Sequence, residues 1–190
     1  MKRYLTILIL SLALNGCLGG TTPPSQFYTL TPTQKQSVSD KHLSIGIERV
    51  RIPNALERPQ ILTGTSDSPE MTLSELNRWV EPLPSLIQRT LITDLSTALP
   101  NSVIENKNFS GGLNDYTILV NIVQLIATPN DKVNLLAWVS IRPKNGETTQ
   151  IKVSETIPVG ATYTDIANAQ SILIGRLSEK IAHYITTLSK

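Results

Sequence analysis

Cysteine and histidine are scarce in this sequence, whose 190 residues include one cysteine and two histidines. Because a single cysteine cannot pair within the chain, the fold has to be held by its apolar core. Metal sites need clustered histidine, cysteine or carboxylate side chains, and His42 and His183 show no such spacing. The sequence also lacks a glycine-rich phosphate loop and a nucleophile elbow. It therefore predicts a protein that is not an enzyme and holds no metal. A hydrolase with paired carboxylates stays open, because such pairs meet only in the folded chain.

An excess of charge of one sign and a long hydrophobic run are also lacking. Lysine and arginine total 17 against 15 aspartates and glutamates, and Lys2 and Arg3 precede the apolar run from Tyr4 to Leu14. Without these two residues the charges balance, which predicts neither nucleic-acid binding nor a polybasic membrane patch. The apolar run spans about 11 residues, and about 20 are needed to cross a bilayer, so no transmembrane helix is expected.

The N-terminus has the order of a secretory signal peptide: a basic start, an apolar run and small residues before a cleavage point. The lone cysteine ends the run Leu14-Asn15-Gly16-Cys17. This arrangement resembles the lipobox of bacterial lipoproteins. The resemblance implies cleavage before Cys17, a diacylglycerol thioether on its sulfur and an N-acyl chain, such as palmitate, on its new amino group. The alternative is an ordinary signal peptide cleaved elsewhere. We expect a signal peptide at 1–16 and no cofactor other than these covalent lipids.

A short polar stretch follows the cysteine. Residues 17–26 are rich in glycine, threonine and proline without apolar periodicity, which predicts an acylated tether. Residues 27–190 then suit a single domain. Residue 18 is leucine. An aspartate at this position signals retention in the inner membrane in enterobacterial lipoproteins, so the resemblance implies an outer-membrane lipoprotein that faces the periplasm.

Apolar residues that alternate with a period of two predict the strands. The longest are expected at 116–122, 133–141 and 151–157 and form an antiparallel meander with turns at 128–131 and 145–146. Shorter strands are expected at 27–30, 43–52, 60–63, 71–74 and 102–105. In the second of these the apolar phase slips, which predicts a bulge near Glu48. The third and fourth form a hairpin with an exposed tip at 64–69, and loops are expected at 31–41 and 106–112.

Two helices are expected from apolar residues spaced three or four apart. The first covers 82–99, with prolines in its first turn and Pro100 after its end. The second begins at Thr162, which resembles the start of a capping box with Asp165, and runs to about Leu188. Its apolar stripe suits packing against the sheet or, alternatively, a coiled coil with a partner. The sequence thus predicts an α/β fold, a mixed, largely antiparallel sheet with two main helices packed in layers.

Two segments before the first helix form a recognisable pattern. Val50-Arg51-Ile52-Pro53 leads to Leu56-Glu57-Arg58-Pro59-Gln60-Ile61, and Asn77-Arg78-Trp79-Val80-Glu81-Pro82-Leu83 opens the helix. With Tyr28-Thr29-Leu30, these segments resemble the PqiC-type lipoproteins, also called ABC-type transport auxiliary lipoproteins. The match in element order runs from about Phe27 to the C-terminus. It departs at Val80, where the family often has alanine.

This resemblance implies a non-catalytic subunit of an intermembrane lipid transport system. Its companions in the family are an MCE-domain protein that bridges the periplasm and either a PqiA-type membrane protein or an ABC permease with its ATPase. The lipoprotein would dock the periplasm-spanning component at the outer membrane and help to maintain membrane integrity. Whether the chain forms a homo-oligomer stays open. A rival function is a periplasmic carrier that holds an acyl chain in an apolar pocket between helix and sheet.

The same two segments supply the candidate partner-binding residues, because arginine and tryptophan are favoured anchors of protein interfaces. Trp79 has a second interpretation, packing in the core. Arg58 and Glu81 also have one, a mutual or local ion pair that braces the loop before the helix. The candidates are Arg58, Pro59, Gln60, Asn77, Arg78, Trp79 and Glu81.

Overall fold

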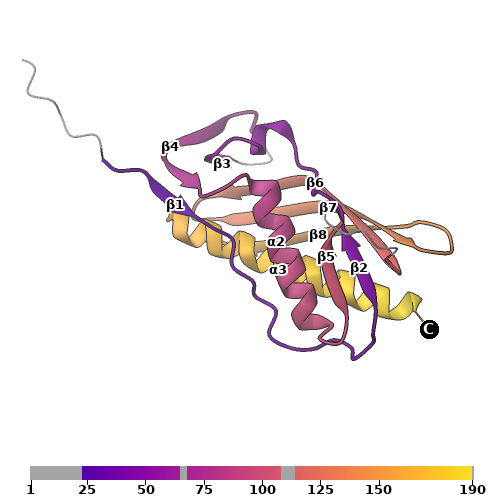
Figure 1. The fold of residues 1–190 in the computed structure, drawn as a ribbon. Coiled ribbons are helices and arrows are strands. Elements are labelled where there is room, and N and C mark those ends of the chain that lie inside the picture. The colour runs from indigo at the N-terminus through magenta and orange to yellow at the C-terminus, as the bar shows by residue number, and fades with distance from the viewer. Residues whose placement is uncertain (1–22, 65–67, 108–113, 190) are drawn as a thin grey trace, which may run out of the picture.

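The structure is a computed structural model that describes residues 23–64, 68–107 and 114–189 (Figure 1). The predicted signal peptide, Cys17 and the start of the tether lie outside these residues. The centre of the predicted hairpin tip and most of the predicted loop at 106–112 also lie outside them.

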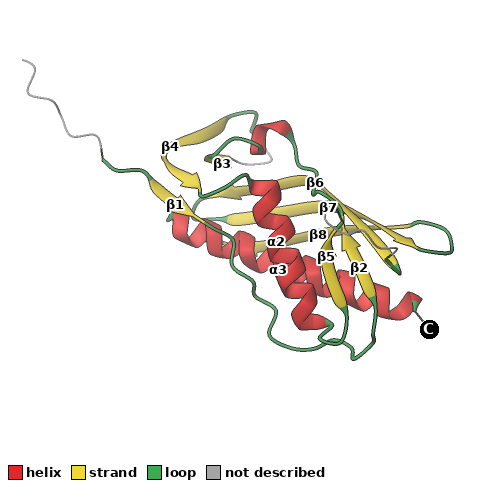
Figure 2. Cartoon of the chain, viewed as in Figure 1, coloured by secondary structure: helices red, strands yellow, loops and turns green. Residues whose placement is uncertain are grey.

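The elements follow the order expected from the sequence (Figure 2). They are β1 (Gln26–Tyr28), β2 (Ser44–Ile47), the short 3₁₀ helix η2 (Asn54–Leu56), β3 (Gln60–Gly64), β4 (Met71–Trp79), α2 (Leu83–Ala98), β5 (Val103–Asn106), β6 (Tyr116–Thr128), β7 (Lys132–Pro143), β8 (Thr149–Pro158) and α3 (Tyr163–Leu188). Several strand boundaries differ from the prediction: β2 ends at Ile47 and not at 52, and β6 continues to Thr128 and not only to 122. The first strand is shorter than the predicted 27–30, and β4 continues to Trp79 instead of ending at Ser74. In both places the backbone follows a neighbouring strand, which the local apolar pattern does not reveal.

The strands form one mixed sheet that forks at β6. Strands β6, β7 and β8 make the predicted antiparallel meander. The other edge of β6 pairs in parallel with β2 near its start and with β3 near its end. From there β2 continues to β5 in parallel, whereas β3 continues to β4 antiparallel and then to β1 in parallel. The predicted mixed, largely antiparallel α/β class is confirmed.

The chain after β2 stays beside β6 beyond the end of the strand. The Arg51 N–H donates to Val120 O at 2.9 Å, and the Ile122 N–H donates to Arg51 O at 2.8 Å. Regular pairing is interrupted between Ile47 and this bridge, and the interruption turns Val50 into the core. The irregularity therefore falls where the sequence predicted a bulge.

Both helices cover one face of the sheet (Figures 1 and 2). Helix α3 begins with the predicted capping box, in which the Asp165 N–H donates to Thr162 Oγ1 at 3.1 Å and the Thr162 N–H donates to Asp165 Oδ2 at 3.0 Å. The apolar stripe of α3 packs against α2, β7 and β8. This burial supports the core interpretation of the stripe over a coiled coil with a partner.

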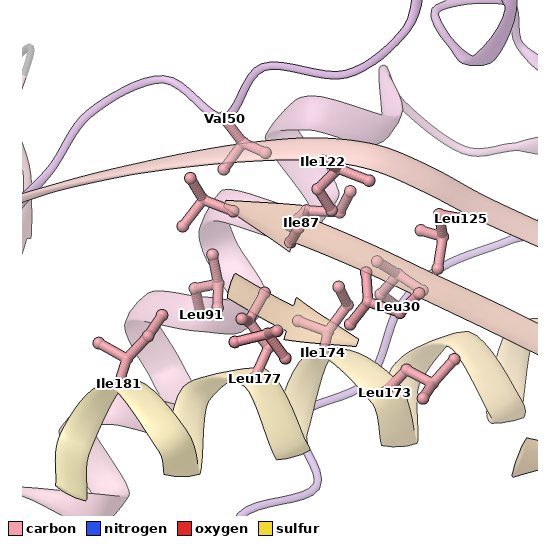
Figure 3. Close-up of a cluster of buried hydrophobic side chains, with 14 of the residues drawn as sticks. Leu30, Val50, Ile87, Leu91, Ile122, Leu125, Leu173, Ile174, Leu177 and Ile181 are labelled. Atoms are coloured by element: carbon pink, nitrogen blue, oxygen red, sulfur yellow. The ribbon is translucent and has the colours of Figure 1, made fainter. Parts of the chain in front are cut away.

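The core lies between the two helices and β6 (Figure 3). Its side chains are almost entirely removed from water, which supplies the main stabilisation of a chain without disulfides. They include Ile87 and Leu91 of α2, Ile122 and Leu125 of β6, and Leu173, Ile174, Leu177 and Ile181 of α3.

Residues 29–43, which we call the strap, run from β1 along both helices to β2 (Figure 1). Their backbone is held at three places. The Thr31 N–H donates to Ser171 Oγ of α3 at 3.1 Å, and the Val38 N–H donates to Ala98 O at the end of α2 at 2.7 Å. Between these contacts, Asp94 of α2 holds the middle of the strap.

Asp94 is a fully buried carboxylate. Its Oδ1 accepts the backbone N–H groups of Thr33 at 2.8 Å and Gln34 at 2.9 Å. Oδ2 has no hydrogen-bond partner, because the nearby Ser178 hydroxyl donates to Ile174 O at 3.0 Å. Burial raises the pKa of Asp94 above 3.8, although the two backbone N–H donors oppose this shift.

Candidate partner-binding site

The two sequence segments meet where β1, β3 and β4 lie side by side. The Trp79 N–H donates to Pro59 O at 2.7 Å, and the Val80 N–H donates to Tyr28 O at 2.9 Å. We call residues 58–60 and 77–81 the motif junction. Three stretches that are distant in the sequence are therefore joined through their backbones at this junction.

Asn77 has a structural role in the junction. Its Oδ1 lies 2.9 Å from the hydroxyl of Tyr28, and its Nδ2 donates to Ser74 Oγ at 2.8 Å. The ring of Tyr28 in turn packs at 6.5 Å from that of Tyr163, at the start of α3. Asn77 thus fixes β1, the strand that follows the predicted tether.

The side chain of Trp79 is 4% exposed and belongs to the core. The structure therefore supports the core interpretation of this residue. A ring this buried offers no surface to another protein in this conformation, and the partner-binding role of Trp79 stays a prediction.

The ion pair at the junction is local. Glu81 binds Arg89 of α2, and Arg89 also donates to Thr29 Oγ1 at 3.2 Å. The predicted brace before the helix is confirmed, but a mutual pair of Arg58 with Glu81 is wrong. The reason is that Arg89 lies two turns along the helix on the side that faces Glu81, a contact that appears only when α2 is placed.

What remains on the surface of the junction is small and combines the basic side chain of Arg58 with the apolar side chain of Val80. Arg58 and Pro59 are exposed, whereas Gln60 and Arg78 are partly buried. The Arg78 guanidinium donates to Glu75 O from Nε at 3.4 Å and from Nη2 at 3.3 Å. The role of this surface in binding a partner stays a prediction.

The described surface has several shallow hollows. The one beside the chain that follows β2, at the fork, has a volume of about 720 Å³ and does not resemble an acyl-chain pocket. Its size suits a small ligand, but its lining is rich in charged side chains. These are Glu48, Arg49, Arg51, Glu57 and Lys107. The space between helices and sheet is instead filled by core side chains (Figure 3), which gives the carrier interpretation no support.

Carboxylates with shifted pKa values have structural partners. Lys180 and then Arg176 hold the pKa of Glu155 below 4.5, and Thr162 holds that of Asp165 below 3.8. Neither of them, nor Asp94, lines the hollow at the fork. Among the described residues, no three histidine, cysteine or carboxylate side chains gather in a way that could hold a metal ion. Within the same residues, no helix combines the length and apolarity that crossing a bilayer demands.

Comparison with known families identifies the chain. The family described as ABC-type transport auxiliary lipoprotein component matches residues 28–182. This chain belongs to that family. The match includes both segments of the motif junction and excludes Cys17. The auxiliary lipoproteins are a family of transport components and not a known family of enzymes.

The curated relatives are of the same type. This auxiliary lipoprotein is 29% identical over 110 residues to the intermembrane transport lipoprotein PqiC of Escherichia coli strain K12, and equally to that of Shigella flexneri. The aligned part covers 56% of this chain and 57% of each relative, so the match spans little more than half of their length.

Solved structures share the fold. An uncharacterised protein superimposes with a TM-score of 0.73 and 18% identity, covering 86% of this auxiliary lipoprotein and 99% of that chain. A protein from Xanthomonas campestris gives 0.71 and 8% identity, with 85% and 94% coverage. At such low identities these likenesses show the fold alone.

Proposed function

We propose that this auxiliary lipoprotein is a non-catalytic subunit of an intermembrane lipid transport system, anchored in the outer membrane and facing the periplasm. The observation that carries the proposal is the family match over 28–182. The similarity to PqiC, named an intermembrane transport lipoprotein, supports the transport role. The proposed partner is an MCE-domain protein that spans the periplasm, together with a PqiA-type protein or an ABC permease in the inner membrane.

The proposed anchor is Cys17, acylated on its sulfur and on its amino group. Two or more acyl chains hold a protein stably on a bilayer, whereas one gives only marginal binding. The motif junction fixes the start of the folded domain, just after the tether. Tyr28 of β1 contacts Asn77 of β4 and Tyr163 of α3, and β4 is in turn bonded to Pro59. The tether therefore leaves the fold from a fixed point.

The proposed docking surface is the exposed part of the junction, Arg58 and Pro59 with the partly buried Arg78. Arginine suits such a surface because its planar guanidinium donates several hydrogen bonds. Trp79 supports the surface from below instead of touching the partner.

Replacing Cys17 with serine tests the anchor. We expect loss of the acyl chains by intact-mass analysis, and release into the soluble periplasm or accumulation of the uncleaved precursor. Wild-type chain should fractionate with the outer membrane on a density gradient. An unchanged membrane fraction of Cys17→Ser, or a wild-type mass without lipid, would contradict the anchor.

Photo-crosslinking in cells tests the docking surface. A photo-reactive residue at Arg58 should capture the MCE-domain protein. The matched control is the same residue at His183, which is exposed on α3 far from the junction along the chain. Capture from His183 but not from Arg58 would place the docking surface elsewhere.

A further inference from the structure

The sheet has a second face, which no helix covers in the described structure. Residues paired across strands project to the same side of a sheet. Asn121 pairs with Trp138, and Trp138 pairs with Lys152, so these three side chains share one face. Their neighbours Ile122 and Val139 point the other way and are buried in the core. We call this side of β6, β7 and β8 the helix-free face.

Trp138 lies near the middle of this face and is 42% exposed. It lines a shallow hollow whose walls are mostly polar. The other lining residues are Arg51, Leu119, Asn121, Ser140 and Gln150. Further apolar side chains lie on the same face, including Leu136 two residues along β7 from Trp138, Ile126 of β6 and the exposed Val123, and the amides of Asn121 and Gln124 lie among them. An indole ring with a polar rim is the arrangement that sits well at a boundary between water and lipid.

The charged side chains that the three strands place on this face are all basic. The three strands of the meander contain a single carboxylate, Glu155. It pairs with the buried Leu135 and therefore projects to the helix side, where it accepts from Lys180 at 2.7 Å and Arg176 at 3.3 Å. The basic residues of the three strands, Lys132, Arg142 and Lys152, all project to the helix-free face.

Two of the three lysines and arginines have acidic neighbours at the rim. Arg142 lies 3.6 Å from Glu48, and Lys132 lies 3.8 Å from Asp131. Lys152, beside Trp138, has no ion pair within the described residues. Arg51 adds a further cation, because it pairs with Asn121 at the edge of β6. The centre of the face is thus cationic as well as aromatic.

This composition fits a lipid surface better than a protein partner. The centres of protein interfaces are depleted of lysine and exclude charge, whereas here Lys152 of the outer strand β8 lies directly beside Trp138. Basic residues are attracted to anionic headgroups, and tryptophan favours the interfacial region. The complementary occupant is therefore a bilayer that contains anionic phospholipid.

The predicted tether can bring this face to such a surface. The eight residues from Leu18 to Ser25 separate Cys17 from β1, and fully extended they span at most about 29 Å. Strand β1 belongs to the same sheet and lies three strands from β6, at about 4.8 Å per strand. A chain held by Cys17 thus stays close enough to the bilayer for the sheet to lie on it.

We propose that the helix-free face, centred on Trp138 and Lys152, lies against the anionic surface of the membrane that holds the tether. The proposal rests on attachment at Cys17, as proposed above, and adds an orientation. The sheet faces the lipid, and the helices and the strap face the periplasm. In this orientation the face supplies electrostatic and interfacial contacts in addition to the acyl chains.

The orientation on the membrane can be tested without acylation in cells. Cys17 is the only cysteine, so its thiol can be coupled specifically to a lipid in vitro. A chain that begins at Cys17 is coupled through this thiol to a maleimide lipid in vesicles of phosphatidylethanolamine and phosphatidylglycerol with brominated acyl chains. Bromine quenches tryptophan only at short range. The wild type has two tryptophans, and Trp79 is buried, so the difference from Trp138→Phe isolates Trp138.

We expect brominated vesicles to lower the Trp138 emission by roughly half, because an interfacial indole lies next to the first acyl carbons. Lys152→Glu should reduce this quenching. The matched control Lys35→Glu, with an exposed lysine on the strap, should not. Vesicles of phosphatidylcholine alone should quench less.

Two outcomes would overturn the proposal. One is a Trp138 that stays unquenched by bromine and open to aqueous acrylamide on coupled vesicles. The other is protein capture by a photo-reactive residue at position 138 in cells, which would assign the face to a protein partner. Either result leaves the lipid anchor itself intact, whereas a chain without lipid in cells would defeat the anchor and not the affinity of the face.

Discussion

The buried carboxylate of Asp94 contributes to the strap as a hydrogen-bond acceptor and as a charge, and two substitutions separate these contributions. Asp94→Ala removes the acceptor of two backbone N–H groups, those of Thr33 and Gln34. Hydrogen bonds to a charged group contribute about 1.5–3 kcal/mol each, and donors left unpaired in the interior add a further cost. We expect Asp94→Ala to lower the free energy of unfolding by about 3–5 kcal/mol.

Asp94→Asn keeps the acceptor and removes the charge. The amide Oδ1 can accept both N–H groups, and its Nδ2 can donate to Ser178 Oγ, whose own proton goes to Ile174 O. We expect a free energy of unfolding within about 1 kcal/mol of the wild type at neutral pH.

The pH dependence follows from the raised pKa of Asp94. A carboxyl whose pKa is higher in the folded than in the unfolded chain binds its proton more tightly in the folded chain. Its stabilising contribution is fully present below 3.8 and is lost as the pH rises through the raised pKa. The free energy of unfolding of Asp94→Asn, relative to the wild type, should therefore increase with pH across this window.

Urea unfolding followed by tryptophan emission, between about pH 4 and pH 7, measures these differences. Comparing the variants at each pH cancels the contributions of other carboxylates, such as Glu155. If Asp94→Asn costs as much as Asp94→Ala at neutral pH, the charge and not the acceptor holds the strap. A difference between Asp94→Asn and the wild type that does not change with pH would refute the raised pKa.

Further substitutions test the fold at single contacts. Thr162→Ala removes the N-cap of α3 and should cost about 1 kcal/mol in the same urea assay. Trp79→Ala should lower the free energy of unfolding by about 3–5 kcal/mol, as expected for a core substitution. An unchanged free energy of unfolding would contradict the burial of this side chain. Gly175→Ala places a Cβ in a steric clash with Thr33 Oγ1, so it should cost about 1–3 kcal/mol, and adding Thr33→Ala should recover part of this loss. Glu155→Gln should lower the free energy of unfolding by at most about 1 kcal/mol. Because the pKa of Glu155 is lowered, the wild type should lose this stability on acidification below pH 4.5, and the variant should not. Equal acid sensitivity of both chains would contradict this.

The helices could be predicted almost to the residue. Prolines at the first turn of α2 and Pro100 after it are local signals, and the capping box of α3 depends on two residues three apart. The long strands of the meander were also legible, because each has one face in the core and largely alternates, but β6 continues past the predicted 122 to Thr128 after a register shift between Ile122 and Gln124. Short strands such as β1 and the end of β4 were not, since their partners lie far away in the sequence.

The candidate site was also only partly predictable. The sequence identified the two segments of the motif junction, but it left residues in each of them with two interpretations. Trp79 proved to be buried, and Glu81 binds Arg89 instead of Arg58. These outcomes depend on how α2 is placed against the sheet, which no local pattern records.

By itself the sequence determined the class of the fold, the elements along the chain and the resemblance to a family, because these depend on short-range periodicity and on residues close together in the chain. Only the tertiary structure decided the fork at β6, the burial of Asp94 and the cationic character of the helix-free face. Net charge is a sum over the whole chain. Its distribution depends on which side of a strand each residue faces, and pairing with distant strands sets that side.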